Sequence, residues 1–98
     1  MSITESTSLR VNADSSRWRK VGESIVVMDL SNSAYFSVDG SVAHVWPDLV
    51  GGTTIDSLAT KIVEEFDADR DVVVTDLVVL CTELLRRGVL AAAIEDPT

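Results

Sequence analysis

The chain has 98 residues, 46% of them hydrophobic, and a formal net charge of −8 at neutral pH. This length fits one small domain with a single core and excludes separate catalytic and substrate domains. The charge argues against a nucleic-acid partner, because a duplex-binding surface needs a basic footprint.

The two ends of the chain predict little regular structure. Residues 1–15 are rich in Ser, Thr, Asn and Asp, and only residues 9–11 could form a short strand. We therefore expect a flexible arm over residues 1–15 and a frayed end over residues 95–98. Residues 16–94 are predicted to form the single folded domain.

Three short segments near the start of this domain predict an antiparallel meander. Residues 16–21 end at a Gly-Glu turn, residues 24–30 contain a β-branched apolar run, and residues 34–38 follow a Ser-Asn-Ser turn. Short strands separated by turn residues are typical of neighbouring antiparallel strands. We expect one three-stranded sheet.

The apolar period then becomes helical. A first helix is predicted over about 42–49, and Pro47 is expected to kink or break it. A second helix begins at a threonine cap, at residue 53 or 54, and a third runs from about 70 to 87. A three-stranded antiparallel sheet followed by three helices predicts an α+β fold of the winged helix-turn-helix type.

No combination of residues predicts catalysis or metal binding. The chain has one cysteine, Cys81, and one histidine, His44, so it lacks the ligand clusters that structural zinc needs. Cys81 is expected to be a buried hydrophobe and His44 a surface residue. We predict no enzymatic activity and no cofactor. No signal peptide or membrane-spanning run is recognisable, so we expect a cytoplasmic protein that does not bind membranes.

The predicted third helix is apolar over more of its circumference than one core stripe requires. If Leu77, Leu80 and Leu84 face the core, a step of about 100° per residue leaves a second apolar flank. That flank comprises Val74, Val78, Cys81 and Leu85. We expect it to contact something other than the domain's own core.

The third predicted strand offers a second binding feature. Alternation directs Phe36 and Val38 to the core face and Tyr35 and Ser37 to the other face. If this strand lies at the edge of the sheet, its free N–H and C=O groups can pair with an extended peptide. The strand edge and the helix flank together predict a peptide-binding groove.

Several segments of residues 18–90 carry a family resemblance in their order and spacing. The landmarks are the strand Ile25–Leu30, the aromatic strand Ala34–Val38, Val45-Trp46 in the first helix, Thr53–Leu58 opening the second, and Asp76-Leu77, Glu83-Leu84-Leu85 and Arg87–Leu90 in and after the third. In this arrangement the chain resembles the PqqD family of leader-peptide recognition proteins. It departs from the family pattern at Pro47 and at Val38-Asp39, where Leu-Asn is more usual.

The resemblance implies a function for the groove. Members bind the leader of a ribosomally made precursor as a strand added to the third strand, with the third helix as the other wall. The chain is most similar to the stand-alone leader-binding proteins of lasso-peptide pathways, which implies a leader peptidase and a cyclase as further partners. Such leaders tend to be basic, which suits an acidic protein.

We accordingly predict a set of peptide-contacting residues. The third strand would supply backbone pairing, Tyr35 and the helix flank would line apolar pockets, and two aspartates would attract basic leader residues. The predicted contacts are Ala34, Tyr35, Phe36, Ser37, Val38, Asp71, Val74, Asp76, Val78, Cys81 and Leu85.

Two alternatives remain open from the sequence. A winged-helix DNA-binding regulator would share the outline, but residues 29–76 carry ten acidic residues against Lys61 and Arg70. A dimerisation module would use the apolar flank of the third helix for a second copy. In either case no catalytic residue is expected.

Overall fold

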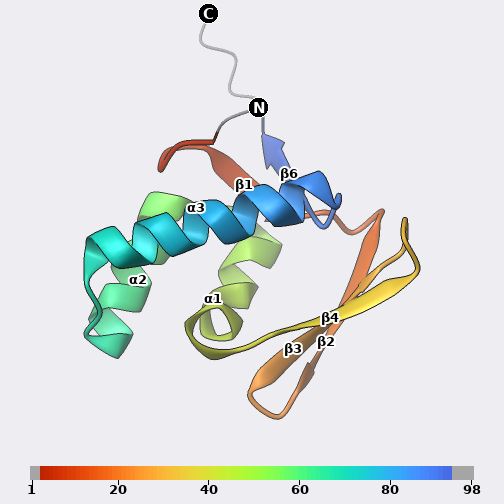
Figure 1. Cartoon of the computed structure of the whole chain (residues 1–98), viewed down its shortest axis with the longest axis horizontal. Helices are drawn as coiled ribbons and strands as arrows, with labels where there is room; N and C mark the ends of the chain where they lie inside the picture. Colours follow the sequence, from red (N-terminus) through yellow and green to blue (C-terminus); the bar gives the residue numbers. More distant parts are fainter. Residues whose placement is uncertain (1–2, 94–98) are drawn as a thin grey trace, which may run out of the picture.

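Two three-stranded antiparallel sheets and three helices make up residues 3–93, the part of the chain that the computed structural model describes (Figure 1). The elements in chain order are β1 (Ser8–Val11), β2 (Ser16–Val21), β3 (Ser24–Asp29), β4 (Ala34–Val38), α1 (Gly40–Gly51), β5 (Thr53–Thr54), α2 (Ile55–Phe66), α3 (Arg70–Arg86) and β6 (Leu90–Ala93). The predicted α+β class is confirmed. The predicted frayed end, residues 95–98, lies outside the described residues.

The first of the two sheets, with strand order β2-β3-β4, is the predicted meander; we call it the meander sheet. Its register pairs Val27 with Trp18 on one side and with Phe36 on the other. Val27 is buried and its cross-strand neighbours lie on the same inward face, because side chains along a strand alternate between the two faces. The meander sheet therefore covers the core with one face only.

The second sheet, with strand order β5-β1-β6, is absent from the sequence-based prediction. The flexible arm predicted over residues 1–15 is wrong, because β1 is the central strand of this sheet and Leu9 and Val11 are buried in the core. A four-residue strand has a weak local signal. Its partners, Thr53 and residues 90–93, lie far away in the chain.

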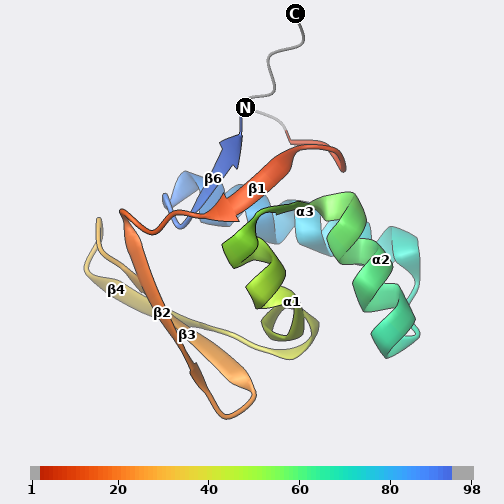
Figure 2. The same ribbon diagram turned by 180° about the vertical axis from the view of Figure 1, so that it is seen from behind.

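The helix α1 contacts both sheets on one side and α2 on the other (Figures 1 and 2). The helix is continuous from Gly40 to Gly51, so of the kink or break predicted at Pro47 the break does not occur. Val45, Trp46 and Leu49 are buried, and this tertiary packing offsets the backbone hydrogen bond that proline cannot make. The α1 helix is also longer at both ends than predicted.

The other two helices begin at the predicted caps. The Thr54 side chain accepts a hydrogen bond from the Ser57 N–H at 3.1 Å, and Asp69 accepts one from the Asp71 N–H at 2.9 Å. Both contacts satisfy N–H groups that the first helical turn leaves unpaired. At the other end of α3, Gly88 adopts a φ of 80°, the left-handed conformation that lets the chain turn into β6.

Four residues of α3, namely Val73, Leu77, Cys81 and Leu84, are buried. Cys81 is only 1% exposed, so it belongs to the core stripe and not to the outward flank predicted for it. Burial raises the pKa of the Cys81 thiol to about 11. The thiol is therefore protonated at neutral pH and is not a nucleophile.

A short segment between β1 and β2 joins the end of α3 to the meander sheet. The Ser15 hydroxyl donates to the Gly88 carbonyl, and the Ser15 carbonyl accepts from the Leu30 N–H at 3.0 Å, just beyond β3. The Asn12 N–H donates to the Val89 carbonyl at 2.7 Å. Residues 12–15 thus fix the position of α3 relative to β3 and its neighbour β4.

Replacing Leu9 with alanine should lower the free energy of unfolding by about 2–5 kcal/mol, because it leaves a cavity at the centre of the β5-β1-β6 sheet. Thermal unfolding followed by circular dichroism measures the loss. Arg10→Ala is the matched control, since Arg10 is the next residue of the same strand and is exposed. Equal stability of the Leu9 variant and the wild type would contradict the packing of β1.

Candidate functional site

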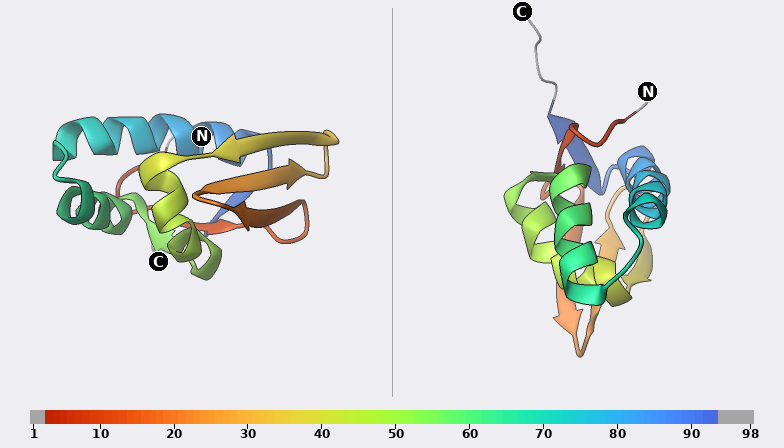
Figure 3. Two further views of the ribbon diagram at one scale, coloured as in Figure 1. Left: turned by 90° about the horizontal axis from the view of Figure 1, so that it is seen from below. Right: turned by 90° about the vertical axis from the view of Figure 1, so that its left-hand side faces the viewer.

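A groove lies between β4 and α3, and Figure 3 (left) shows both elements along the same side of the molecule. Its pocket has a volume of about 290 Å³. The lining residues, which define the β4–α3 groove, are Phe36, Ser37, Val38, Asp39, Val42, Leu80, Glu83, Leu84 and Arg87. One wall is therefore a strand and the other a helix, as the sequence predicts.

Strand β4 forms an edge of the meander sheet, with β3 as its neighbour. Half of the backbone N–H and C=O groups of an edge strand point away from its own sheet. In β4 Val38 is buried and Phe36 is partly buried, so the strand is anchored to the core. Its free backbone groups are held in an extended geometry that a further strand can pair with.

The floor of the groove is apolar. Phe36, Val42 and Leu80 are partly buried side chains that pack on the core, and Leu84 is buried among them. Such a surface accommodates an apolar side chain from a bound segment. Complete burial of one leucine-sized side chain is worth about 1.5–3 kcal/mol.

The rim of the groove is ordered by ion pairs. The Arg87 Nε donates to the Glu83 carboxylate at 3.2 Å, and the Arg86 guanidinium donates to the same carboxylate through Nη2 at 2.6 Å. These arginines hold the pKa of Glu83 below its ordinary value, with the hydrogen bond from Arg87 as the largest cause. The guanidinium of Arg87 also lies 5.5 Å from the centre of the Phe36 ring, within cation–π range.

Charge changes sign along the groove. Asp39 follows directly after β4 at its Val38 end, whereas Arg87 lies over Phe36, nearer to the beginning of the strand. Asp76 lies one helical turn before Leu80 on the same side of α3 and is exposed. An extended segment in this groove therefore meets carboxylates at one end and, at the other, the Arg87 guanidinium with its partner Glu83.

Asp29 is a buried acidic residue where β3 ends, opposite the beginning of β4. Its carboxylate accepts a hydrogen bond from the Asn32 side chain at 2.8 Å and from the Ser31 N–H at 3.1 Å. These bonds, that from the Asn32 side chain above all, hold the pKa of Asp29 below its ordinary value. The carboxylate thereby fixes the turn that leads into β4.

Not all of the predicted site residues lie at the groove. Phe36, Ser37 and Val38 line it, Ala34 is partly buried at the beginning of the strand, and Asp76 lies on the adjoining side of α3. Tyr35 is 69% exposed on the opposite face of the sheet, so the prediction that its side chain lines a groove pocket is wrong.

The predicted helix flank is on the wrong side of α3. At about 100° per residue, Leu80, Glu83 and Arg87 lie to one side of the buried Leu84, and Val74, Val78 and Leu85 lie to the other. Those latter three side chains pack partly buried against the core, and Asp71 lies further round the helix among the exposed positions.

Six groove residues were missing from the predicted set: Asp39, Val42, Leu80, Glu83, Leu84 and Arg87. The pattern Leu-x-x-Glu-Leu-x-x-Arg was a usable signal, because an acid and an arginine four residues apart beside a leucine stripe mark the border of a helix face. Which border faces β4 depends on the packing of the whole domain, and helical periodicity does not contain that information.

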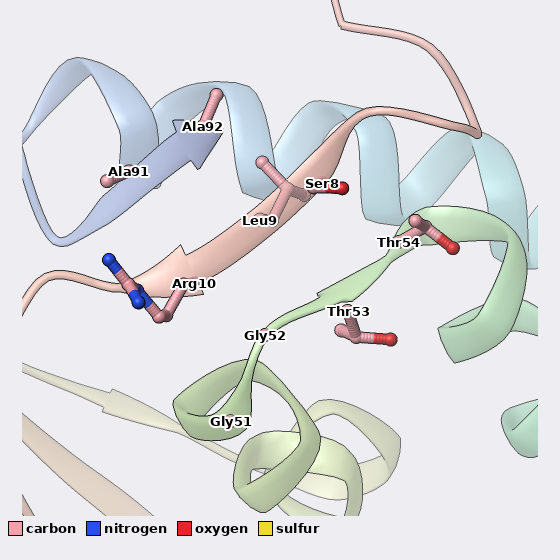
Figure 4. Close-up of a pocket in the computed structure, with 9 residues that line it drawn as sticks. All are labelled: Ser8, Leu9, Arg10, Gly51, Gly52, Thr53, Thr54, Ala91 and Ala92. Atoms are coloured by element: carbon pink, nitrogen blue, oxygen red, sulfur yellow. The ribbon is translucent and has the colours of Figure 1, made fainter. Parts of the chain in front are cut away.

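A second hollow of about 350 Å³ lies around the β5-β1-β6 sheet (Figure 4). It is lined largely by small residues, including Gly51, Gly52, Ala91 and Ala92, and Arg10 is its charged residue. Within residues 3–93, no three His, Cys, Asp or Glu side chains converge as metal ligands. In that same part of the chain, no helix combines the length and apolar character needed to cross a membrane.

Comparison with known proteins agrees with this fold. The family described as coenzyme PQQ synthesis protein D (PqqD) matches residues 24–90. A solved structure described as "TbiB1 in Complex with the TbiA(beta) Leader Peptide" superposes with a TM-score of 0.76 at 21% sequence identity, covering 88% of this chain and 99% of that one. No curated protein matches the chain. Because the family match spans more than half of the sequence, the chain belongs to the PqqD family.

Proposed function

We propose that this protein binds the leader segment of a ribosomally made precursor peptide in the β4–α3 groove and does not itself catalyse a reaction. The observation that carries the proposal is an unpaired strand edge, β4, beside an apolar pocket on α3. An extended peptide can pair with the edge through its backbone while alternate side chains enter the pocket. The solved structure of the same fold contains a leader peptide on TbiB1.

Two of the other sheet edges, β2 and β5, are poorer sites for strand addition, and the third, β6, does not line the β4–α3 groove. Edge strand β2 exposes Arg17, Arg19 and Lys20, and exposed cations on an edge discourage pairing with another strand. Edge strand β5 has two residues, too few for a stable ladder. Strand β4, by contrast, borders the groove that separates it from α3.

Distinct residues have distinct roles in this proposal. The backbone of Ala34–Val38 pairs with the peptide, and Phe36, Leu80 and Leu84 receive one of its apolar side chains. Asp39 and Asp76 attract basic leader residues and raise the rate of association. The Arg87 end of the groove favours a neutral or acidic part of the same peptide.

A carrier of this kind needs an enzyme to receive its cargo. We propose that the precursor belongs to a lasso-peptide pathway, and that the bound leader is presented to a separate leader peptidase and then to a cyclase. The cytoplasm, where ribosomal peptides are made, is the proposed location. The role of the protein is then to raise the local concentration of the precursor at the enzyme.

Strand addition can be tested with the leader peptide encoded beside the gene for this protein. Two versions of the peptide, N-methylated at odd or at even positions of the pairing segment, remove alternate backbone donors. Fluorescence anisotropy should show saturable binding of the unmodified peptide, a loss of roughly tenfold or more in affinity for one version, and a small loss for the other. Equal affinity for all three peptides would exclude strand pairing.

Two substitutions on α3 test which side of the helix binds. Leu80→Ala should weaken leader binding roughly tenfold, because it removes part of the pocket wall. Val78→Ala is the matched control: it lies on the other flank and should cost about 1 kcal/mol of stability with affinity unchanged. Anisotropy and thermal unfolding measure the two effects. Weaker binding by the Val78 variant alone would show that the opposite flank is the binding wall.

A further inference from the structure

The meander sheet has a second face, turned away from the core, on which no side chain is buried. In register across β2, β3 and β4, this outer face consists of two rows: Arg17–Met28–Tyr35 and Arg19–Val26–Ser37. Tyr35 is 69% exposed, so most of its side chain is in contact with solvent. Ser37 also lines the leader-binding groove, but Arg17, Arg19, Val26, Met28 and Tyr35 do not.

The outer face has a charge opposite to that of the protein. The whole chain has a net charge of −8, yet the charged residues in these two rows are both arginines. Within residues 3–93, four of the eight basic side chains have a carboxylate within ion-pair distance, and Arg17 and Arg19 are among the four that do not. Arg17 donates hydrogen bonds to the backbone carbonyls of Ala13 and Ser16, which leave its charge without a counterion. The two arginines, together with Tyr35, Met28 and Val26, form an apolar, basic patch.

We propose that this outer face docks the enzyme that processes the leader, through an enzyme surface that carries carboxylates around an apolar patch. The inference rests on the proposed leader-binding function. Tyrosine, methionine and arginine are the residue types enriched in protein–protein interfaces. A phosphate-rich membrane or nucleic acid is a poorer fit, because sixteen acidic residues elsewhere in this small protein would repel it.

The position of the patch explains why an enzyme would bind there. A leader strand added to β4 extends the meander sheet, and its outward side chains continue the rows that end at Tyr35 and Ser37. An enzyme seated on the outer face would therefore lie directly beside the bound leader. The leader pairs with the edge of β4 and the enzyme covers its outer face, so the leader and the enzyme do not compete for the strand.

The test uses the full-length protein and the purified leader peptidase encoded beside the precursor gene, with binding measured by biolayer interferometry at low salt. Wild-type protein should bind the peptidase saturably, and Arg19→Glu should weaken that binding about tenfold or more. Lys20→Glu is the matched control. It makes the same change of charge at the next residue of β2, whose side chain points to the other face, and should retain nearly wild-type affinity.

Several results would overturn the proposal. They are absence of peptidase binding to the wild type, equal weakening by both substitutions, and sedimentation showing a dimer of this protein that Arg19→Glu dissociates. A separate leader titration on the same variants keeps the two claims apart. One outcome separates them: the protein does not bind the leader, but it binds the peptidase and Arg19→Glu abolishes that binding. This outcome would refute the proposed function and support the docking face.

Discussion

A β-strand at the edge of a sheet presents backbone groups that its own sheet cannot pair. In this protein the edge strand β4 borders a groove only because α3 lies beside it. The groove exists because the end of α3 is held at a fixed position beside β4. Ser15 makes that connection, since it binds the Gly88 carbonyl after α3 and the Leu30 N–H after β3. A segment outside the groove thus sets the spacing of its two walls.

The inward and outward faces of β4 have different tasks in this account. Phe36 and Val38 anchor the strand and form part of the groove, while Tyr35 and Ser37 belong to the outer face of the meander sheet. The alternation of a strand makes this separation possible within five residues. The charged residues differ between the two sides: Arg17 and Arg19 lie on the outer face, whereas the groove combines Asp39 and Glu83 with Arg87.

Local patterns predicted the meander strands and the caps of α2 and α3, because β-branched runs, turn residues and helix caps act over a few residues. They named residues 9–11 as a possible strand but missed β5, β6 and the sheet that these form with β1, because that pairing joins distant parts of the chain. Helical periodicity gave the buried stripe of α3 but chose the wrong flank for the groove. Both flanks, at Val78 and at Leu80, contain apolar residues, and only tertiary packing distinguishes them.

Hydrogen–deuterium exchange of the protein with and without its leader peptide tests the central claim most directly. The account predicts slower exchange of backbone amides in Ala34–Val38 when the leader is bound, and unchanged exchange in the other meander edge, Ser16–Val21. Protection confined to Ser16–Val21 or to Leu90–Ala93, or saturable binding with no protection of β4, would contradict strand addition at this groove.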